Sequence, residues 1–177
     1  DGCRGRGHLW QGTVAKSCLA GRIPLGIWPD RGRYRVMKEA IFMDEIVVPP
    51  GAIDGNGHVN NVAFVGWMQD VATRHFESAG CGAAMRAAGA TWVVRSHHVE
   101  YFMPAFEGDR LRVLTWIVDF GRARSMRRYR FLRASDGRLL VRGETDWVFV
   151  SAGTLRPCSI PEEIKRAFTL GPSGWEP

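Results

Sequence analysis

The segment from residue 61 to residue 78 carries apolar side chains around most of a helical circumference. Its polar side chains fall in one stripe at helical spacing: Gln69, Asp70, Thr73, Arg74 and Glu77. The other sides of the helix are apolar, with Val62, Phe64, Val65, Trp67, Met68, Val71, Ala72 and Phe76. A helix of this kind has to be covered on several sides, because so little of its surface is suited to water. This requirement limits the folds that the rest of the chain can form.

The other long periodic segments read as strands. One strand is expected over residues 40–48, where Pro49 and Pro50 end it, and four more over residues 91–102, 109–120, 124–133 and 139–151. Short turns at 107–109 and 135–137 make neighbouring strands antiparallel. Glycines around Cys81 end the helix, and a short Ala-rich helix follows it. The pattern predicts an α+β fold in which a curved five-stranded antiparallel sheet is wrapped around one long helix.

The length of the chain and the distribution of its charge predict one folded domain preceded by a basic N-terminal segment. With 177 residues and 45% hydrophobic content, the chain has enough core for one domain. Its net charge is +6, but residues 1–36 hold seven Lys or Arg against two Asp, so the remainder is nearly neutral. This distribution argues against nucleic acid as a partner. Residues 1–36 also lack periodicity, so we expect an N-terminal extension that is poorly structured or non-native, or a native arm or targeting remnant, before a domain spanning 37–177.

No apolar run is long enough for a signal-peptide core or a membrane span, so no membrane association and a cytoplasmic location are expected. The four cysteines, Cys3, Cys18, Cys81 and Cys158, form no C-x-x-C pair and are expected to be reduced thiols. His97 and His98 are adjacent in a predicted strand and point to opposite faces. Neither a metal site nor any other cofactor is predicted.

Residues 53–61, IDGNGHVNN, place an acid, an imidazole and three carboxamides immediately before the buried helix. Each has an ordinary structural explanation: Asp54 or Asn60 can cap the helix, Asn56 can form a turn, and His58 can bind buried backbone groups. Their concentration in nine residues favours a catalytic site instead.

These residues also carry a family resemblance. Residues 54–61 run into the sequence FVGW at 64–67, and weaker matches follow at 99–104, 108–109, 156–157 and 160–161. With these motifs, residues 37–177 resemble the hot-dog-fold thioesterases of the 4-hydroxybenzoyl-CoA and acyl-ACP thioesterase group. The resemblance implies hydrolysis of acyl-CoA or acyl-ACP thioesters by a homodimer or homotetramer whose sites lie between subunits.

The resemblance also implies roles for the loop residues. Asp54 matches the catalytic carboxylate, which acts either as a general base on water or as a nucleophile. Asn56 and His58 match residues that orient water and the acyl group, their side chains expected on one side of an extended loop. The backbone N–H that polarises the carbonyl falls at Asn61, in the first turn of the helix. Plant-type acyl-ACP thioesterases carry further Glu and Cys residues where this chain has residues 103–105, MPA, so a mechanism that needs them is not expected here.

Six arginines lie within residues 122–133, the densest charge cluster outside the N-terminal segment. They either form a solvated strand face or bind a carrier, through the phosphates of CoA or the acidic surface of ACP. Arg124, Arg127 and Arg128 are the substrate-binding candidates, although strand alternation puts Arg127 on the face opposite the other two.

Two other functions remain open from the sequence. Hot-dog domains also serve as dehydratases or as non-hydrolytic acyl-binding modules. The basic N-terminal segment leaves a regulatory or nucleic-acid-associated role as a further alternative.

Overall fold

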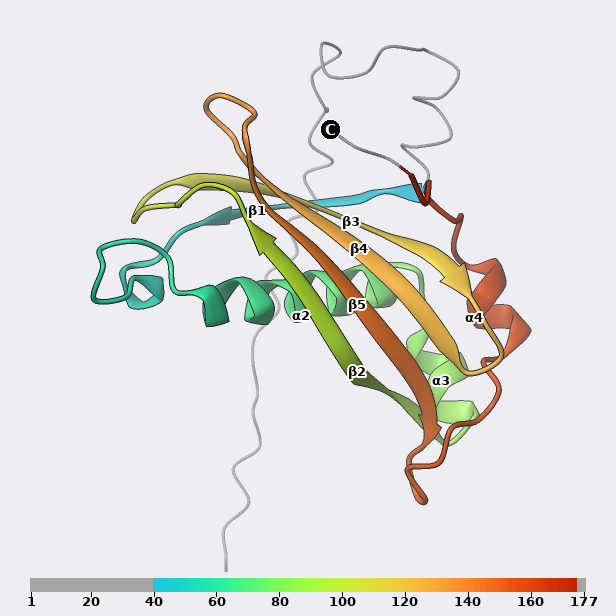
Figure 1. Ribbon diagram of the computed structural model, residues 1–177. Coiled ribbons are helices and arrows are strands. Elements are labelled where there is room, and N and C mark those ends of the chain that lie inside the picture. The colour runs from blue at the N-terminus through green and yellow to red at the C-terminus, as the bar shows by residue number, and fades with distance from the viewer. Residues whose placement is uncertain (1–39, 175–177) are drawn as a thin grey trace, which may run out of the picture.

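The computed structural model describes residues 40–174. The predicted N-terminal extension, with Cys3 and Cys18, lies outside the described residues. Figure 1 shows the long helix α2 (Asn61–Ser78) lying across one face of a curved sheet. The predicted helix boundaries are confirmed, and the short Ala-rich helix is α3 (Gly82–Ala87).

The sheet has five strands: β1 (Phe42–Val47), β2 (Ala90–Tyr101), β3 (Arg110–Phe120), β4 (Arg124–Arg133) and β5 (Leu139–Ser151). Their order in the sheet is β1-β3-β4-β5-β2, and every neighbouring pair is antiparallel. Register shifts interrupt the pairing at Val94/Ser96, Ile117/Asp119 and Phe131/Leu132. Bulges of this kind bend strands and increase their twist, so they help the sheet to curve over the helix. The predicted hot-dog arrangement is therefore confirmed.

The main core lies between α2 and the inner face of the sheet. From the helix it contains Phe64, Met68, Val71 and Ala72, and from the strands Val113, Tyr129, Phe131 and Val141. Gly143 of β5 lets the helix approach closely, because a Cβ there would lie 2.8 Å from Met68 Cε and Sδ. The helix is nevertheless not covered on every apolar side by its own chain, since Val62 is 74% exposed.

Two short elements were not predicted. A 3-10 turn, η2 (Pro50–Ala52), precedes the candidate catalytic loop, and α4 (Glu162–Arg166) packs Ile164 into a second apolar cluster with Cys81, Ile117 and Phe168. Beyond α4 the chain reaches β3 where β1 no longer pairs with it. There the Gly171 N–H donates to the Ile117 carbonyl at 2.8 Å, and Trp116 Nε1 donates to the Pro172 carbonyl at 3.1 Å.

Candidate functional site

The loop before α2 is a tight turn rather than the extended segment that the spacing of its side chains suggested. Ile53 and Val59 form an antiparallel bridge, and inside it the Gly57 N–H donates to the Asp54 carbonyl at 3.0 Å. Gly57 has φ of +80°, a conformation that is strained for residues with a Cβ. Asn56 and Gly57 therefore do form a turn, which was one of the structural alternatives for these residues.

Asp54 is held in this turn through one carboxylate oxygen. Its Oδ1 accepts a hydrogen bond from the Asn56 N–H at 2.8 Å and lies 3.7 Å from His58 Nδ1. The Asp54 side chain is 24% exposed. Within the part of the chain that the structure describes, Oδ2 has no hydrogen-bond partner, so one oxygen of a positioned carboxylate can face a reactant.

The start of α2 supplies unpaired backbone donors. Asn60 is the N-cap, and it accepts the Val62 N–H through Oδ1 at 2.9 Å and the Ala63 N–H through its carbonyl at 2.9 Å. The Asn61 N–H has no acceptor among residues 40–174. An unpaired N–H at the positive end of a helix dipole stabilises negative charge.

The predicted catalytic residues are thus brought together to different extents. Asp54 and His58 face each other, and Asn56 contributes its backbone to Asp54 while the residue itself is exposed. Asn61 is linked to the end of β2, because its carbonyl accepts a hydrogen bond from the Tyr101 hydroxyl at 3.2 Å. The Asn60 N–H, which donates to the Ala52 carbonyl at 2.8 Å, joins the helix start to η2.

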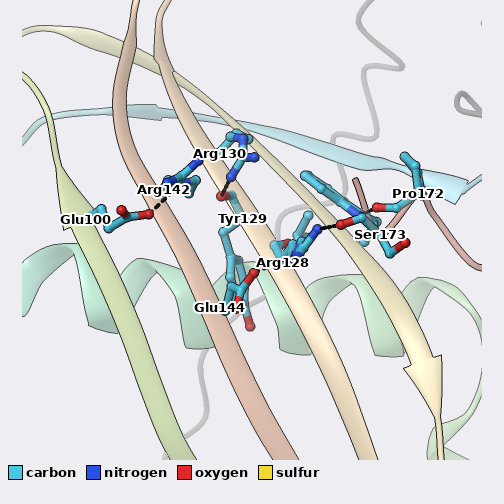
Figure 2. A network of polar contacts seen from close by, with 10 residues as sticks. Glu100, Arg128, Tyr129, Arg130, Arg142, Glu144, Pro172 and Ser173 are labelled. Atoms are coloured by element: carbon cyan, nitrogen blue, oxygen red, sulfur yellow. Dashed lines mark hydrogen bonds and ion pairs between the residues drawn. The ribbon is translucent and has the colours of Figure 1, made fainter. Parts of the chain in front are cut away.

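The candidate carrier-binding arginines do not share a face. Figure 2 shows Arg128 on the outer face of the sheet, where its Nε lies 2.7 Å from Glu144 Oε1 and its Nη1 donates to the Ser173 carbonyl. Arg124 lies on the same face, with Nε 3.5 Å from Asp146 Oδ1. Nearby, Arg142 pairs with Glu100. These carboxylates neutralise much of the charge in this part of the sheet.

Arg127 points to the inner face and is only 5% exposed. Its Nη1 contacts His75 Nδ1 at 2.9 Å and Thr115 Oγ1 at 3.2 Å. Burial, and then the charge of Arg127, lower the pKa of His75 to about 3, so the imidazole is neutral and accepts a hydrogen bond from the guanidinium. The buried position of Arg127 does not fit a contact with carrier phosphates.

His75 was not among the predicted site residues. Strand alternation gave a signal for this interior polar pair, since Arg127 falls between Ser125 and Tyr129 on the apolar side of β4. Nothing in the local sequence marks His75 as its partner, because the two residues lie on different elements.

Metal-binding clusters and membrane-spanning helices are both absent from the described region. Within residues 40–174, no group of three or more His, Cys, Asp or Glu side chains could hold a metal ion. None of the helices there combines the length and apolar character that crossing a membrane requires. Cys81 and Cys158 are free thiols, as predicted.

Comparison with known proteins identifies relatives for most of the described region. The Thioesterase-like superfamily matches residues 48–168. A protein of Ruegeria pomeroyi, L-carnitine dehydrogenase/betainyl-CoA thioesterase, is 29% identical over 120 residues, which is 68% of this chain and 24% of that protein. The chain therefore spans about a quarter of the length of this relative.

Solved structures show the same fold. The 1,4-dihydroxy-2-naphthoyl-CoA thioesterase Slr0204 from Synechocystis has a TM-score of 0.66 at 22% identity, covering 72% of this chain and 94% of that one. The 12:0-ACP thioesterase from Umbellularia californica has a TM-score of 0.65 at 23% identity, covering 72% of this chain and 50% of that one. The superfamily match spans well over half of the chain, and the hot-dog architecture agrees with it. The chain belongs to the Thioesterase-like superfamily, as its sequence motifs predicted.

Proposed function

We propose that this protein hydrolyses acyl thioesters carried by CoA or by acyl carrier protein, with Asp54 as the catalytic carboxylate. The observation that carries the proposal is that residues 54–61 hold both Asp54 Oδ2, which accepts no hydrogen bond within the described region, and the unpaired Asn61 N–H at the start of α2. The family and a related betainyl-CoA thioesterase support thioester chemistry in general.

In the general-base form of the reaction, water attacks the thioester carbonyl while Asp54 takes its proton. The Asn61 N–H donates to the oxyanion that develops on the carbonyl oxygen. Collapse of this tetrahedral species breaks the carbon–sulfur bond, and the thiol leaves with the proton returned by Asp54. In the nucleophilic form, Asp54 attacks the carbonyl itself, the carbon–sulfur bond breaks and the thiolate leaves. Water then hydrolyses the resulting anhydride, which releases the free acid, restores the Asp54 carboxylate and supplies the proton that the thiolate takes up. His58, with Nδ1 3.7 Å from Asp54, and Asn56 orient the water and acyl group in either form.

The surroundings of the helix start favour a site completed by a second copy of the chain. Val62 is 74% exposed and Tyr101 is 42% exposed, and both lie beside Asn61, Val62 in sequence and Tyr101 through its hydrogen bond to the Asn61 carbonyl. Apolar side chains gathered in this way are typical of an interface. We therefore retain the homodimer or homotetramer as part of the proposal, and sedimentation measurements test it. A cytoplasmic location also stays a prediction.

Arg124 and Arg128, on the outer face of the sheet, are the proposed contacts for the carrier, either the phosphates of CoA or the acidic surface of ACP. Arg127 is excluded from these contacts by its burial.

The test is Asp54→Asn, which keeps the shape of the side chain but removes its ability to accept a proton. Turnover of a panel of acyl-CoA and acyl-ACP substrates is expected to fall by ~10²–10⁴. Asp70→Asn is the matched control, because Asp70 is an exposed carboxylate on α2. Wild-type kinetics in folded Asp54→Asn protein would contradict the site assignment, and acyl binding without turnover in the parent would indicate an acyl-binding module.

A further inference from the structure

A cavity of about 210 Å³ lies between the C-terminal half of α2 and the inner face of the sheet. A single water needs only about 10–15 Å³, so the cavity has room for an organic group. Its helix residues are Ala72, Thr73 and Phe76. Because a helix advances about 1.5 Å per residue, Ala72 lies about 16 Å along α2 from Asn61. The cavity is therefore separate from the loop that holds Asp54.

Most of the cavity wall is apolar and aromatic. It includes Phe76, Met85, Trp92, Ile117, Phe120, Trp147 and Phe168. Such a wall favours the burial of a hydrocarbon or ring, and it offers little to a small polar solute.

Arg127 is the one residue in this wall with a full charge. Its Nη1 contacts are His75 and Thr115, and neither carries a negative charge. Burial raises the pKa of the neighbouring Tyr129, which keeps that phenol neutral as well. No carboxylate among the described residues pairs with Arg127. A buried guanidinium without a counter-charge is costly, and an anion that reaches it is correspondingly stabilised.

A second donor in the same wall lacks an acceptor. The Trp92 indole Nε1 is buried and has no hydrogen-bond partner in the described part of the chain. The great majority of buried donors in proteins are satisfied, so this indole is an exception, but its nitrogen has almost no surface toward the cavity. The guanidinium of Arg127 is therefore the group that favours a ligand accepting hydrogen bonds.

We infer that this cavity binds the distal end of the acyl group, and that Arg127 selects thioesters whose acyl chain ends in a carboxylate. The inference rests on the proposed thioesterase function and names its substrate class. A carboxylate gains charge-assisted hydrogen bonds from the guanidinium, whereas a terminal methyl leaves the cation uncompensated. A terminal trimethylammonium group is repelled.

The experiment compares matched substrates that differ only at the distal end. Pairs run from dodecanedioyl-CoA and lauroyl-CoA up to hexadecanedioyl-CoA and palmitoyl-CoA, whose chains are long enough to cross most of the distance between Asn61 and the cavity. In the best pair, the intact protein is expected to prefer the carboxylate-ended member by about 10- to 100-fold in kcat/KM, the range of a hydrogen bond to a charged group.

Arg127→Met keeps most of the volume and removes the charge. It is expected to abolish the preference while hydrolysing the methyl-ended substrates at least as well as the parent. Arg112→Met is the matched control on the neighbouring strand, where Arg112 Nε lies 3.7 Å from Glu45 Oε1, and it should leave the preference unchanged. Arg127→Lys retains the cation and is expected to retain part of the preference.

Equal hydrolysis of both members of every pair by the parent would overturn the inference, whether or not Arg127→Met folds. An unchanged preference in folded Arg127→Met would do the same. If the parent hydrolyses no thioester, the proposed function fails, and calorimetric titration with decanoate and with uncharged 1-decanol decides the cavity separately. Tighter binding of decanoate that is lost in Arg127→Met would support the anion site, and equal binding of the two ligands would overturn it.

Discussion

Replacing His75 by asparagine removes a half-buried group whose titration couples the stability of this fold to pH. The imidazole stacks on Phe42 with ring centroids 5.0 Å apart, and it meets the edge of Phe168 at 5.0 Å. Its Nδ1 contacts Arg127 at 2.9 Å. Burial, followed by the charge of Arg127, lowers the pKa of His75 from 6.5 to about 3. Asparagine can still place an acceptor oxygen near Arg127, but it does not titrate.

The direction of the effect follows from the protons bound in each state. Between pH 6.5 and pH 3 the unfolded chain protonates this histidine while the folded chain does not. The stability is therefore fully present above pH 6.5 and is lost as the pH falls toward 3. A pH of about 5 lies roughly 1.5 units below the pKa of histidine in the unfolded chain. The stability lost over this interval is therefore about 2 kcal/mol of unfolding free energy.

The assay is urea unfolding of parent and His75→Asn at about pH 7.5 and about pH 5. The parent is expected to lose about 2 kcal/mol more than the variant between these two conditions. His98→Asn is the matched control, because His98 is exposed on β2, and it should follow the parent. If His75→Asn loses as much stability on acidification as the parent does, His75 is not held neutral by its surroundings and the reasoning is refuted.

Two further predictions concern the outer face of the sheet. Arg124→Ala combined with Arg128→Ala is expected to raise KM for acyl-CoA with kcat nearly unchanged, and to have no effect on an N-acetylcysteamine thioester, which lacks the nucleotide. An equal loss on both substrates would assign these arginines a structural role. Gly171→Ala is expected to cost about 1–3 kcal/mol in urea unfolding, because the new Cβ would lie 2.2 Å from Trp116 Cδ1. Gly174→Ala, whose Cβ meets no atom within 4 Å, is its control, and similar losses in the two variants would contradict the close packing.

The local pattern of apolar residues was sufficient to predict the long helix and the strands. The boundaries of α2, β4 and β5 agree with those predicted, because the period of apolar residues is a property of each segment by itself. The loop chemistry before α2 was also visible locally, and so was the Asn60 cap as one of its alternatives. The helix α4 was missed because five residues carry too little periodicity. Its acidic first turn, basic last turn and preceding Pro161 were the available signals.

The interior site was decided by contacts between distant segments, whereas the turn at Asp54–Gly57 is closed by local hydrogen bonds. Alternation placed Arg127 opposite Arg124 and Arg128, yet it could not say which face the helix would cover. Once α2 packs on the inner face, His75 meets Arg127 across 52 residues of sequence, with Phe42 and Phe168 on either side. Desolvation depends on all the atoms around a group, and those atoms are assembled only when the sheet closes over the helix. Only the tertiary structure therefore determines the neutral histidine, the uncompensated arginine and the cavity beside them. The helix and strands that carry these groups could be predicted from the sequence alone.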